Sequence, residues 1–247
     1  MYQLPVRAKS ADPQNLGTAD CALFCHCDDG SDYAVKDSNS GAYVAHSEWF
    51  CKHLGDRVGI ASPDCRWVEV NGEVAFGSRW ESGHDPNNWW HRVKSGHIEK
   101  DRVAPTISRI LAFDLFVNNE DRHGSNYIVR PQRNGQWSFL AFDYSRAWRA
   151  ISWPLPEPPM SDQVMTKRNF KIINTLLGGI LDVQEALFVT GNIRQVPKSA
   201  VSQILDSQHD SWLSPQDGND ILTYWQSSEF TRRIDKIEEG LKNGEYI

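Results

Sequence analysis

The first eighty residues alternate short apolar segments with strong turn signals, which is the pattern of antiparallel β-strands. Residues 21–36 are predicted to form a β-hairpin, because Asp28-Asp29-Gly30-Ser31 separates two strand-like runs. Residues 65–78 are predicted to form a second hairpin around the two-residue turn Asn71-Gly72. Between the hairpins, residues 42–54 place their large apolar side chains on one side of a helix. We therefore expect a small antiparallel β-sheet accompanied by one helix.

From about residue 98 the spacing of apolar residues changes to the period of an α-helix. Residues 103–118 carry this pattern, and two short strand-like runs follow at 126–130 and 137–142. Residues 153–160 are rich in proline and are expected to form an extended loop. Further helices are predicted at 169–180, 182–189, 197–206, 217–225 and 228–243. The second part of the chain is thus expected to be mainly helical.

These patterns predict an α+β fold with two lobes. Residues 1–80 would form a small N-terminal lobe, built from an antiparallel β-sheet and one helix. Residues 81–247 would form a larger, mainly helical lobe. A chain of 247 residues, of which 40% are apolar, is long enough to bury such a core.

Composition and charge exclude several functional classes. The net charge of −6 argues against direct binding of nucleic acid. No run of eighteen apolar residues occurs, so no membrane-spanning helix is expected. The N-terminus lacks the apolar core of a signal peptide, and the five cysteines are an odd number. We therefore expect a cytoplasmic protein without a disulfide framework.

Candidate chemistry is concentrated in the loop that follows the predicted helix at 103–118. Asp121 precedes Asn126 by five positions, and Asp143 comes directly after an apolar strand. Enzymes that transfer phosphoryl groups use one Asp to orient the attacking hydroxyl, and an Asn and a second Asp to hold Mg²⁺. Each of these residues alone is often only a turn former or a cap. Their combined order predicts an ATP- and magnesium-dependent phosphotransferase.

Lys36 ends the second strand of the first hairpin, and a predicted helix follows it. A lysine in this place can contact the α- and β-phosphates of a nucleotide, and Glu48 on the helix is a natural partner to position it. A lysine at a strand end is otherwise usually solvated. The interpretation therefore depends on the Asp121, Asn126 and Asp143 set downstream.

Two further assignments complete the candidate site. His123 is expected to orient Asp121 or to contact the γ-phosphate. Phe76-Gly77-Ser78 leads from the second hairpin toward the helical part. As a linker between lobes it would offer backbone groups to the edge of adenine. The alternative is an ordinary connection that contacts no ligand.

These residues resemble the HipA-like kinase family, a bacterial branch related to the phosphatidylinositol-kinase-like fold. The resemblance covers roughly residues 20–245. Ordinary protein kinases have His-Arg-Asp in the catalytic loop, whereas Asp121-Arg122-His123 has the order of the HipA-like and lipid-kinase-like branches. The segments that carry the resemblance are Asp28-Asp29-Gly30, Tyr33-Ala34-Val35-Lys36, Phe113 to Asn126, and Phe142-Asp143-Tyr144-Ser145.

The resemblance implies a two-lobed serine/threonine protein kinase with ATP and Mg²⁺ in the cleft. By this resemblance Lys36 contacts the phosphates, Asp121 is catalytic, and Asn126 and Asp143 hold the metal. It also implies a protein substrate and a possible antitoxin or regulatory partner, because several relatives are toxins of toxin–antitoxin pairs. The chain would correspond to the kinase core without the extra N-terminal domain of the toxin kinases.

The chain departs from other kinases in its phosphate-binding loop, because it contains no GxGxxG motif. Residues 10–18 are the candidate replacement, with Gly17 supplying backbone freedom. Ser10, beside this loop, is a candidate for self-phosphorylation. Two other functions remain open. One is a small-molecule or lipid-head-group kinase with the same machinery, and the other is a pseudokinase that binds nucleotide or a partner without transfer.

Overall fold

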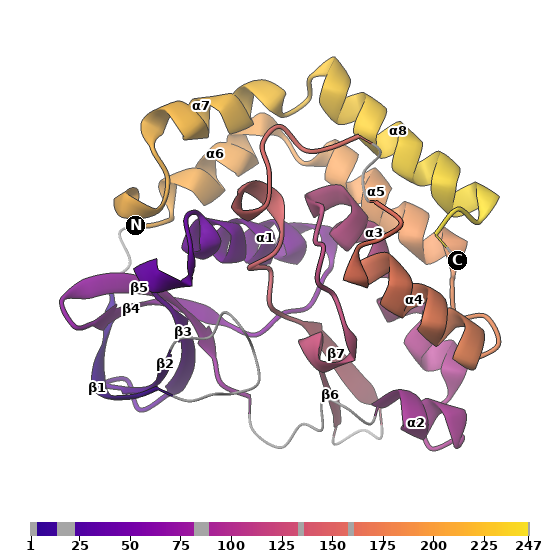
Figure 1. The fold of residues 1–247 in the computed structure, drawn as a ribbon, viewed down its shortest axis with the longest axis horizontal. Coiled ribbons are helices and arrows are strands. Elements are labelled where there is room, and N and C mark those ends of the chain that lie inside the picture. Colours follow the sequence, from indigo (N-terminus) through magenta and orange to yellow (C-terminus); the bar gives the residue numbers. More distant parts are fainter. Residues whose placement is uncertain (1–3, 14–22, 82–88, 133–135, 158–160, 247) are drawn as a thin grey trace.

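The computed structural model of the protein describes residues 4–13, 23–81, 89–132, 136–157 and 161–246. A β-barrel formed by the N-terminal strands lies at one end of the molecule, drawn in indigo and purple in Figure 1. Helix α1 lies between this barrel and the C-terminal helices, drawn in orange and yellow. The chain therefore mixes helices and strands, as the sequence predicts.

Five strands form the barrel in the order β1-β2-β3-β5-β4. Their bounds are Val6–Asp12 (β1), Leu23–Cys27 (β2), Asp32–Lys36 (β3), Cys65–Val70 (β4) and Glu73–Arg79 (β5). The predicted hairpins are present as β2–β3 and β4–β5, each antiparallel. The prediction of an antiparallel sheet is wrong, because β1 pairs in parallel with β4 and closes the sheet into a barrel.

Strand β1 escaped prediction for two physical reasons. Its less exposed side chains, Val6, Ala8 and Ala11, are mostly small, so the strand carries little apolar signal. An irregularity in its pairing with β2, between Ala8 and Ser10, also breaks the alternation of inward and outward residues. Ser10 accordingly lies within β1 and not in a phosphate-binding loop, while residues 14–18 of that predicted loop are outside the described residues.

The inside of the barrel is a separate small core. It consists of Cys25, Cys27, Tyr33, Val35, Val68, Val70 and Ala75. Because side chains alternate along a strand, Tyr33 and Val35 point inward, and Ala34 and Lys36 lie together on the opposite face of β3. The pleat of β3 thus directs Lys36 away from the barrel core and toward the rest of the molecule.

Gly77 is required inside this barrel because no side chain fits there. A Cβ at this position would overlap with Cγ2 of Val68 and would lie 3.3 Å from Cδ1 of Tyr33. We expect Gly77→Ala to lower the free energy of unfolding by about 1–3 kcal/mol, the usual effect of overfilling a packed core. Urea denaturation measures this, with Ser78→Ala on the opposite face of β5 as the control. An unchanged denaturation midpoint for Gly77→Ala would contradict the packing argument.

Outside the barrel, the described residues form eight α-helices and a separate two-stranded hairpin. The helices are Val44–Val58 (α1), Trp89–Lys94 (α2), Lys100–Val117 (α3), Met165–Leu176 (α4), Val183–Gln195 (α5), Lys198–Asp206 (α6), Pro215–Tyr224 (α7) and Ser228–Asn243 (α8). The hairpin joins β6 (Tyr127–Pro131) to β7 (Trp137–Ala141). Short 3₁₀ helices are Ser38–Ser40 (η1), Gly124–Asn126 (η2), Trp148–Ala150 (η3) and Asp210–Trp212 (η4).

Side-chain caps determine the residue at which several of the helices begin. Asp182, Ser214 and Ser227 each accept a backbone N–H at the beginning of α5, α7 and α8, respectively.

Among the described helices, none is both long and apolar enough to span a membrane.

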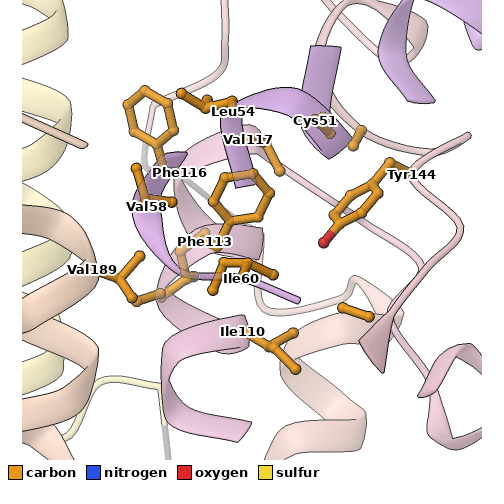
Figure 2. Close-up of a cluster of buried hydrophobic side chains, with 14 of the residues drawn as sticks. Cys51, Leu54, Val58, Ile60, Ile110, Phe113, Phe116, Val117, Tyr144 and Val189 are labelled. Carbon is orange, nitrogen blue, oxygen red and sulfur yellow. The ribbon is translucent and has the colours of Figure 1, made fainter. Parts of the chain in front are cut away.

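The main core joins α1 to the helices that follow the barrel. Figure 2 shows Leu54 and Val58 of α1 close to Phe113 and Phe116 of α3, with Val189 of α5 beside them. The same buried cluster also includes Trp67 and Phe76 from the barrel strands β4 and β5. The core therefore extends across residue 80. It anchors both α1, which carries Glu48, and α3, whose end begins the candidate loop. The division into two lobes stays a prediction.

Candidate active site

Lys36 connects the barrel to the helical part of the molecule. Its ammonium group donates to Oε1 of Glu48 on α1 and, at 2.6 Å, to Oδ1 of Asp143 after β7. The backbone N–H of Tyr144 donates to the same Glu48 oxygen at 2.9 Å. The Lys36 side chain is only 7% exposed. The structure thus brings together Lys36, Glu48 and Asp143, which come from three different segments of the chain.

The charges of these three residues depend on one another. Burial alone would lower the pKa of Lys36, but Asp143 and Glu48 outweigh it and raise that pKa above its ordinary value. Burial would raise the pKa of Asp143, but the ammonium of Lys36 and the hydroxyl of Ser145 hold it well below its usual range. The pKa of Glu48 is raised, chiefly by burial. Asp143 is therefore an anion at neutral pH, as a metal ligand must be.

Asp143 has a left-handed backbone conformation, with a φ angle of +65°. Its Oδ1 also accepts a hydrogen bond from the hydroxyl of Ser145 at 2.6 Å. The N–H of Phe142, just before it, donates to the carbonyl of Asn126 at 3.3 Å. The two predicted metal ligands, Asn126 and Asp143, are therefore held close together by the backbone.

The side chain of Asn126 has one satisfied end and one open end. Its Nδ2 donates to the carbonyl of Asp121 at 2.9 Å, which fixes the orientation of the amide. Its Oδ1 is buried and has no hydrogen-bond partner. An amide oxygen beside a carboxylate is a suitable donor set for Mg²⁺, which prefers few protein oxygens and keeps sites for phosphate and water. Asn126 and Asp143 therefore fit a magnesium ion.

Asp121 lies in the loop between α3 and η2, and it is partly exposed. Its backbone N–H donates to Oδ1 of Asn119 at 3.3 Å, and its carbonyl accepts from Asn126. His123 lies two residues later, where its ring accepts the N–H of Ser125 at 3.3 Å and caps η2. The catalytic roles of Asp121 and His123 stay predictions.

The linker assignment of Phe76-Gly77-Ser78 is wrong. All three residues lie within β5, which is paired on one side with β3 and on the other with β4. Their backbone groups are used within the sheet, so they are not a connecting segment. The strand ends at Arg79, and Trp80 follows with its ring 5.3 Å from that of Phe24 in an edge-to-face contact.

A cavity of about 620 Å³ adjoins this region at Lys36. It lies between the start of α1, the start of β5 and residues 209–212. Asp121, Asn126 and Asp143 do not line this cavity, so it meets the candidate site only through Lys36. Within the part of the chain that the structure describes, no group of three His, Cys, Asp or Glu side chains is placed to hold a metal ion.

The sequence profile of the HipA-like kinases matches residues 17–144, slightly more than half of the chain. The chain belongs to the HipA-like kinase family. The matched range contains Lys36, Glu48, Asp121, Asn126 and Asp143. A HipA-like kinase is a phosphotransferase of the protein-kinase type, which agrees with the function class expected from the motif.

Solved structures show the same fold in this HipA-like kinase as in two bacterial proteins. The proinflammatory kinase CtkA of Helicobacter pylori is 12% identical with a TM-score of 0.63, and the alignment covers 97% of this chain and 98% of CtkA. HipA of Shewanella oneidensis, solved with HipB and operator DNA, is 12% identical with a TM-score of 0.50. That alignment covers 84% of this chain and 57% of HipA, so the chain spans little more than half of that protein. No curated protein matches the sequence.

Sequence reasoning missed the place of Asp114 at the candidate site of this HipA-like kinase. Asp114, on the buried face of α3, forms an ion pair with Arg122, and both are almost completely buried. A signal was present, because Asp114 is an acidic residue in the middle of an apolar helical pattern. Only the fold, however, shows which residues this pair contacts.

Proposed function

We propose that the protein is an ATP- and Mg²⁺-dependent kinase that transfers the γ-phosphate to a serine or threonine hydroxyl of a protein. The observation that carries the proposal is the ion pair of Lys36 with both Glu48 and Asp143, together with the buried Oδ1 of Asn126, which has no hydrogen-bond partner. In this arrangement Lys36 would bind phosphate while Asn126 and Asp143 bind Mg²⁺, which is what stabilising a transferring phosphoryl group requires.

Each residue of the candidate site would have its own role in the reaction. Lys36, positioned by Glu48, would contact the α- and β-phosphates, and Asn126 and Asp143 would hold Mg²⁺. Bound Mg²⁺ would neutralise the charge that develops on the phosphates. Asp121 would orient the acceptor hydroxyl and take its proton, and His123 would support it.

The nucleotide would lie between two lobes, residues 1–80 and 81–247, against the face of β3 that carries Ala34 and Lys36. Because Phe76-Gly77-Ser78 is part of β5, we assign the adenine contact to Trp80, directly after the end of this strand. Its ring and that of Phe24, which contact each other, would provide the aromatic surface for it. A regulatory partner, comparable to the HipB protein bound to Shewanella HipA, is part of the proposal.

The test is incubation with γ-labelled ATP and Mg²⁺, alone and with cell lysate. We expect label on this protein or on lysate proteins, and we expect Asp143→Asn to remove it and to weaken Mg²⁺-dependent ATP binding at least about tenfold, because a charge-assisted contact contributes about 1.5–3 kcal/mol. Asp56→Asn on α1 is the matched control, since Asp56 pairs only with the nearby Lys52 in the described contacts.

Equal labelling by Asp143→Asn and the unaltered protein would contradict the assignment of Asp143. Magnesium-dependent ATP binding without label on any protein would instead indicate a kinase for small molecules or lipid head groups, or a pseudokinase. Addition of metabolite and lipid pools to the same assay separates these two.

A further inference from the structure

Asp114 is the most enclosed carboxylate of the catalytic region. It lies on α3 and has no exposed surface. Its Oδ2 accepts from Nε of Arg122 at 2.8 Å, and its Oδ1 accepts from Nη2 of Arg122 at 2.9 Å. The same Oδ1 accepts from Nδ2 of Asn119 at 2.9 Å. One carboxylate therefore holds two residues of the loop, one on each side of Asp121.

The guanidinium of Arg122 extends this contact to both proposed metal ligands. Its Nη1 donates to the carbonyl of Asn126 at 3.1 Å and to the carbonyl of Phe142, the residue before Asp143. The ring of Tyr144, directly after Asp143, lies 4.8 Å from the guanidinium carbon. A planar guanidinium can satisfy a carboxylate and two carbonyls at once, which a lysine ammonium cannot do with the same geometry.

Thr166, on α4, also holds the loop in place. The hydroxyl of Thr166 donates to the carbonyl of Asn119 at 2.6 Å and accepts the N–H of Arg122 at 2.8 Å. Since Asp121 lies between Asn119 and Arg122, its backbone is fixed from both neighbours. The side chain of Asp121 remains partly exposed.

We infer that Asp114 and Arg122 are positioning residues, which set the relative places of Asp121, Asn126 and Asp143. This inference rests on the proposed function for the roles of those three residues. A buried ion pair contributes little net stability, because the desolvation of two charges offsets their attraction. Its main effect is geometric. Three hydrogen bonds to the carboxylate of Asp114, and two from Arg122 to backbone carbonyls, hold the loop in a single arrangement. Residues that orient metal ligands in this way affect metal affinity strongly.

The test compares Arg122→Lys and Asp114→Asn with Arg233→Lys as a matched control. Arg233 is equally buried, and its guanidinium donates to the carbonyls of Leu115, Phe116 and Pro156, outside the loop. Binding of Mn²⁺ is measured in the presence of a non-hydrolysable ATP analogue, by the electron paramagnetic resonance signal of free Mn²⁺. We expect both loop variants to weaken Mn²⁺ binding roughly 10- to 100-fold, and the control to leave it unchanged.

Folded loop variants, verified by circular dichroism, that bind Mn²⁺ as tightly as the unaltered protein would overturn the inference. So would an equal loss in Arg233→Lys, because the effect would then be a general loss of stability. A failure of the proposed function is seen separately, since the unaltered protein would then bind no Mn²⁺ with the analogue.

Hydrogen exchange of the unaltered protein keeps the inference testable if the variants do not fold. The backbone N–H groups of Asn119, Arg122 and Asn126 donate to the carbonyl of Asp114, the hydroxyl of Thr166 and the carbonyl of His123, at 2.8, 2.8 and 2.9 Å. We expect these amides to exchange as slowly as amides in the middle of α3. Exchange as fast as that of an exposed turn such as Asn71-Gly72 would overturn the inference, because the loop would not be held.

Discussion

Replacing Asp121 with asparagine is expected to slow phosphate transfer about a thousandfold while leaving Mg²⁺-dependent ATP binding close to normal. An amide cannot take the proton of the acceptor hydroxyl, and a positioned base typically contributes a factor of about 10²–10⁴. Folding should be preserved, because asparagine has nearly the same size and shape as aspartate, and the backbone contacts of Asp121 with Asn119 and Asn126 are unchanged. Rates of transfer to protein, together with calorimetric titration of ATP, measure both effects.

The same Asp56→Asn control separates this effect from a general effect of removing a carboxylate. Equal transfer rates in Asp121→Asn and the unaltered protein would exclude Asp121 as the base. A loss of ATP binding in Asp121→Asn, with the fold intact, would instead assign Asp121 to the metal or the phosphates.

Replacing Lys36 with methionine is expected to have the largest effect on stability. Glu48 and Asp143 would then remain buried without their shared cation. Removing one partner of a buried ion pair costs about 3–5 kcal/mol in the free energy of unfolding, and here two carboxylates lose it. Urea denaturation at pH 7 measures the loss. Lys52→Met on α1, the helix that carries Glu48, is the control, with an expected cost of at most about 1 kcal/mol, because Lys52 pairs with an exposed Asp56 at i+4.

The pH dependence of this difference has a definite sign. In the unaltered protein the pKa of Asp143 is lowered, so its contribution to stability is present at neutral pH and is lost as the pH falls below about 4. Without Lys36, burial raises the pKa of both Asp143 and Glu48, and protonation on acidification then stabilises the variant. We expect the difference between the two proteins to narrow from pH 7 to pH 5. A difference that stays constant over this range would contradict the electrostatic explanation.

The parts of the fold that were predictable have strong local signals. Both barrel hairpins follow from their turn sequences, and α3 follows from its apolar period, although it begins at Lys100 and ends at Val117. Helix α5 continues to Gln195, beyond the predicted end at 189, because Thr190 and Ile193 are buried against the core. Tertiary packing there outweighs the weak helix preference of Thr190 and Gly191. Strand β1 and helix α2 had no comparable signal.

The candidate site was likewise predicted only in part. Lys36, Glu48 and Asp143 were predicted from the order of short motifs, and the fold brings them into contact. The linker role of Phe76-Gly77-Ser78 was predicted wrongly, because the predicted hairpin already contained these residues and the fold pairs them on both sides within β5. The contacts of Arg122 with Asn126 and Phe142 depend on where β7 ends relative to the loop. Such contacts are properties of the folded chain and not of any local pattern.

The parallel pairing of β1 with β4 also limits how other proteins can recognise this molecule. An extended peptide can bind a sheet by adding a strand to an unpaired edge, as many recognition domains allow. In the closed barrel each of the described strands has a neighbour on both sides, although β1 pairs with β4 only at Val6 and Arg7, so little of the backbone is left for such an edge. A protein that binds the barrel would therefore be recognised mainly through side chains on the barrel surface. Substitutions on that surface, and not changes in strand pairing, would then alter the choice of partner.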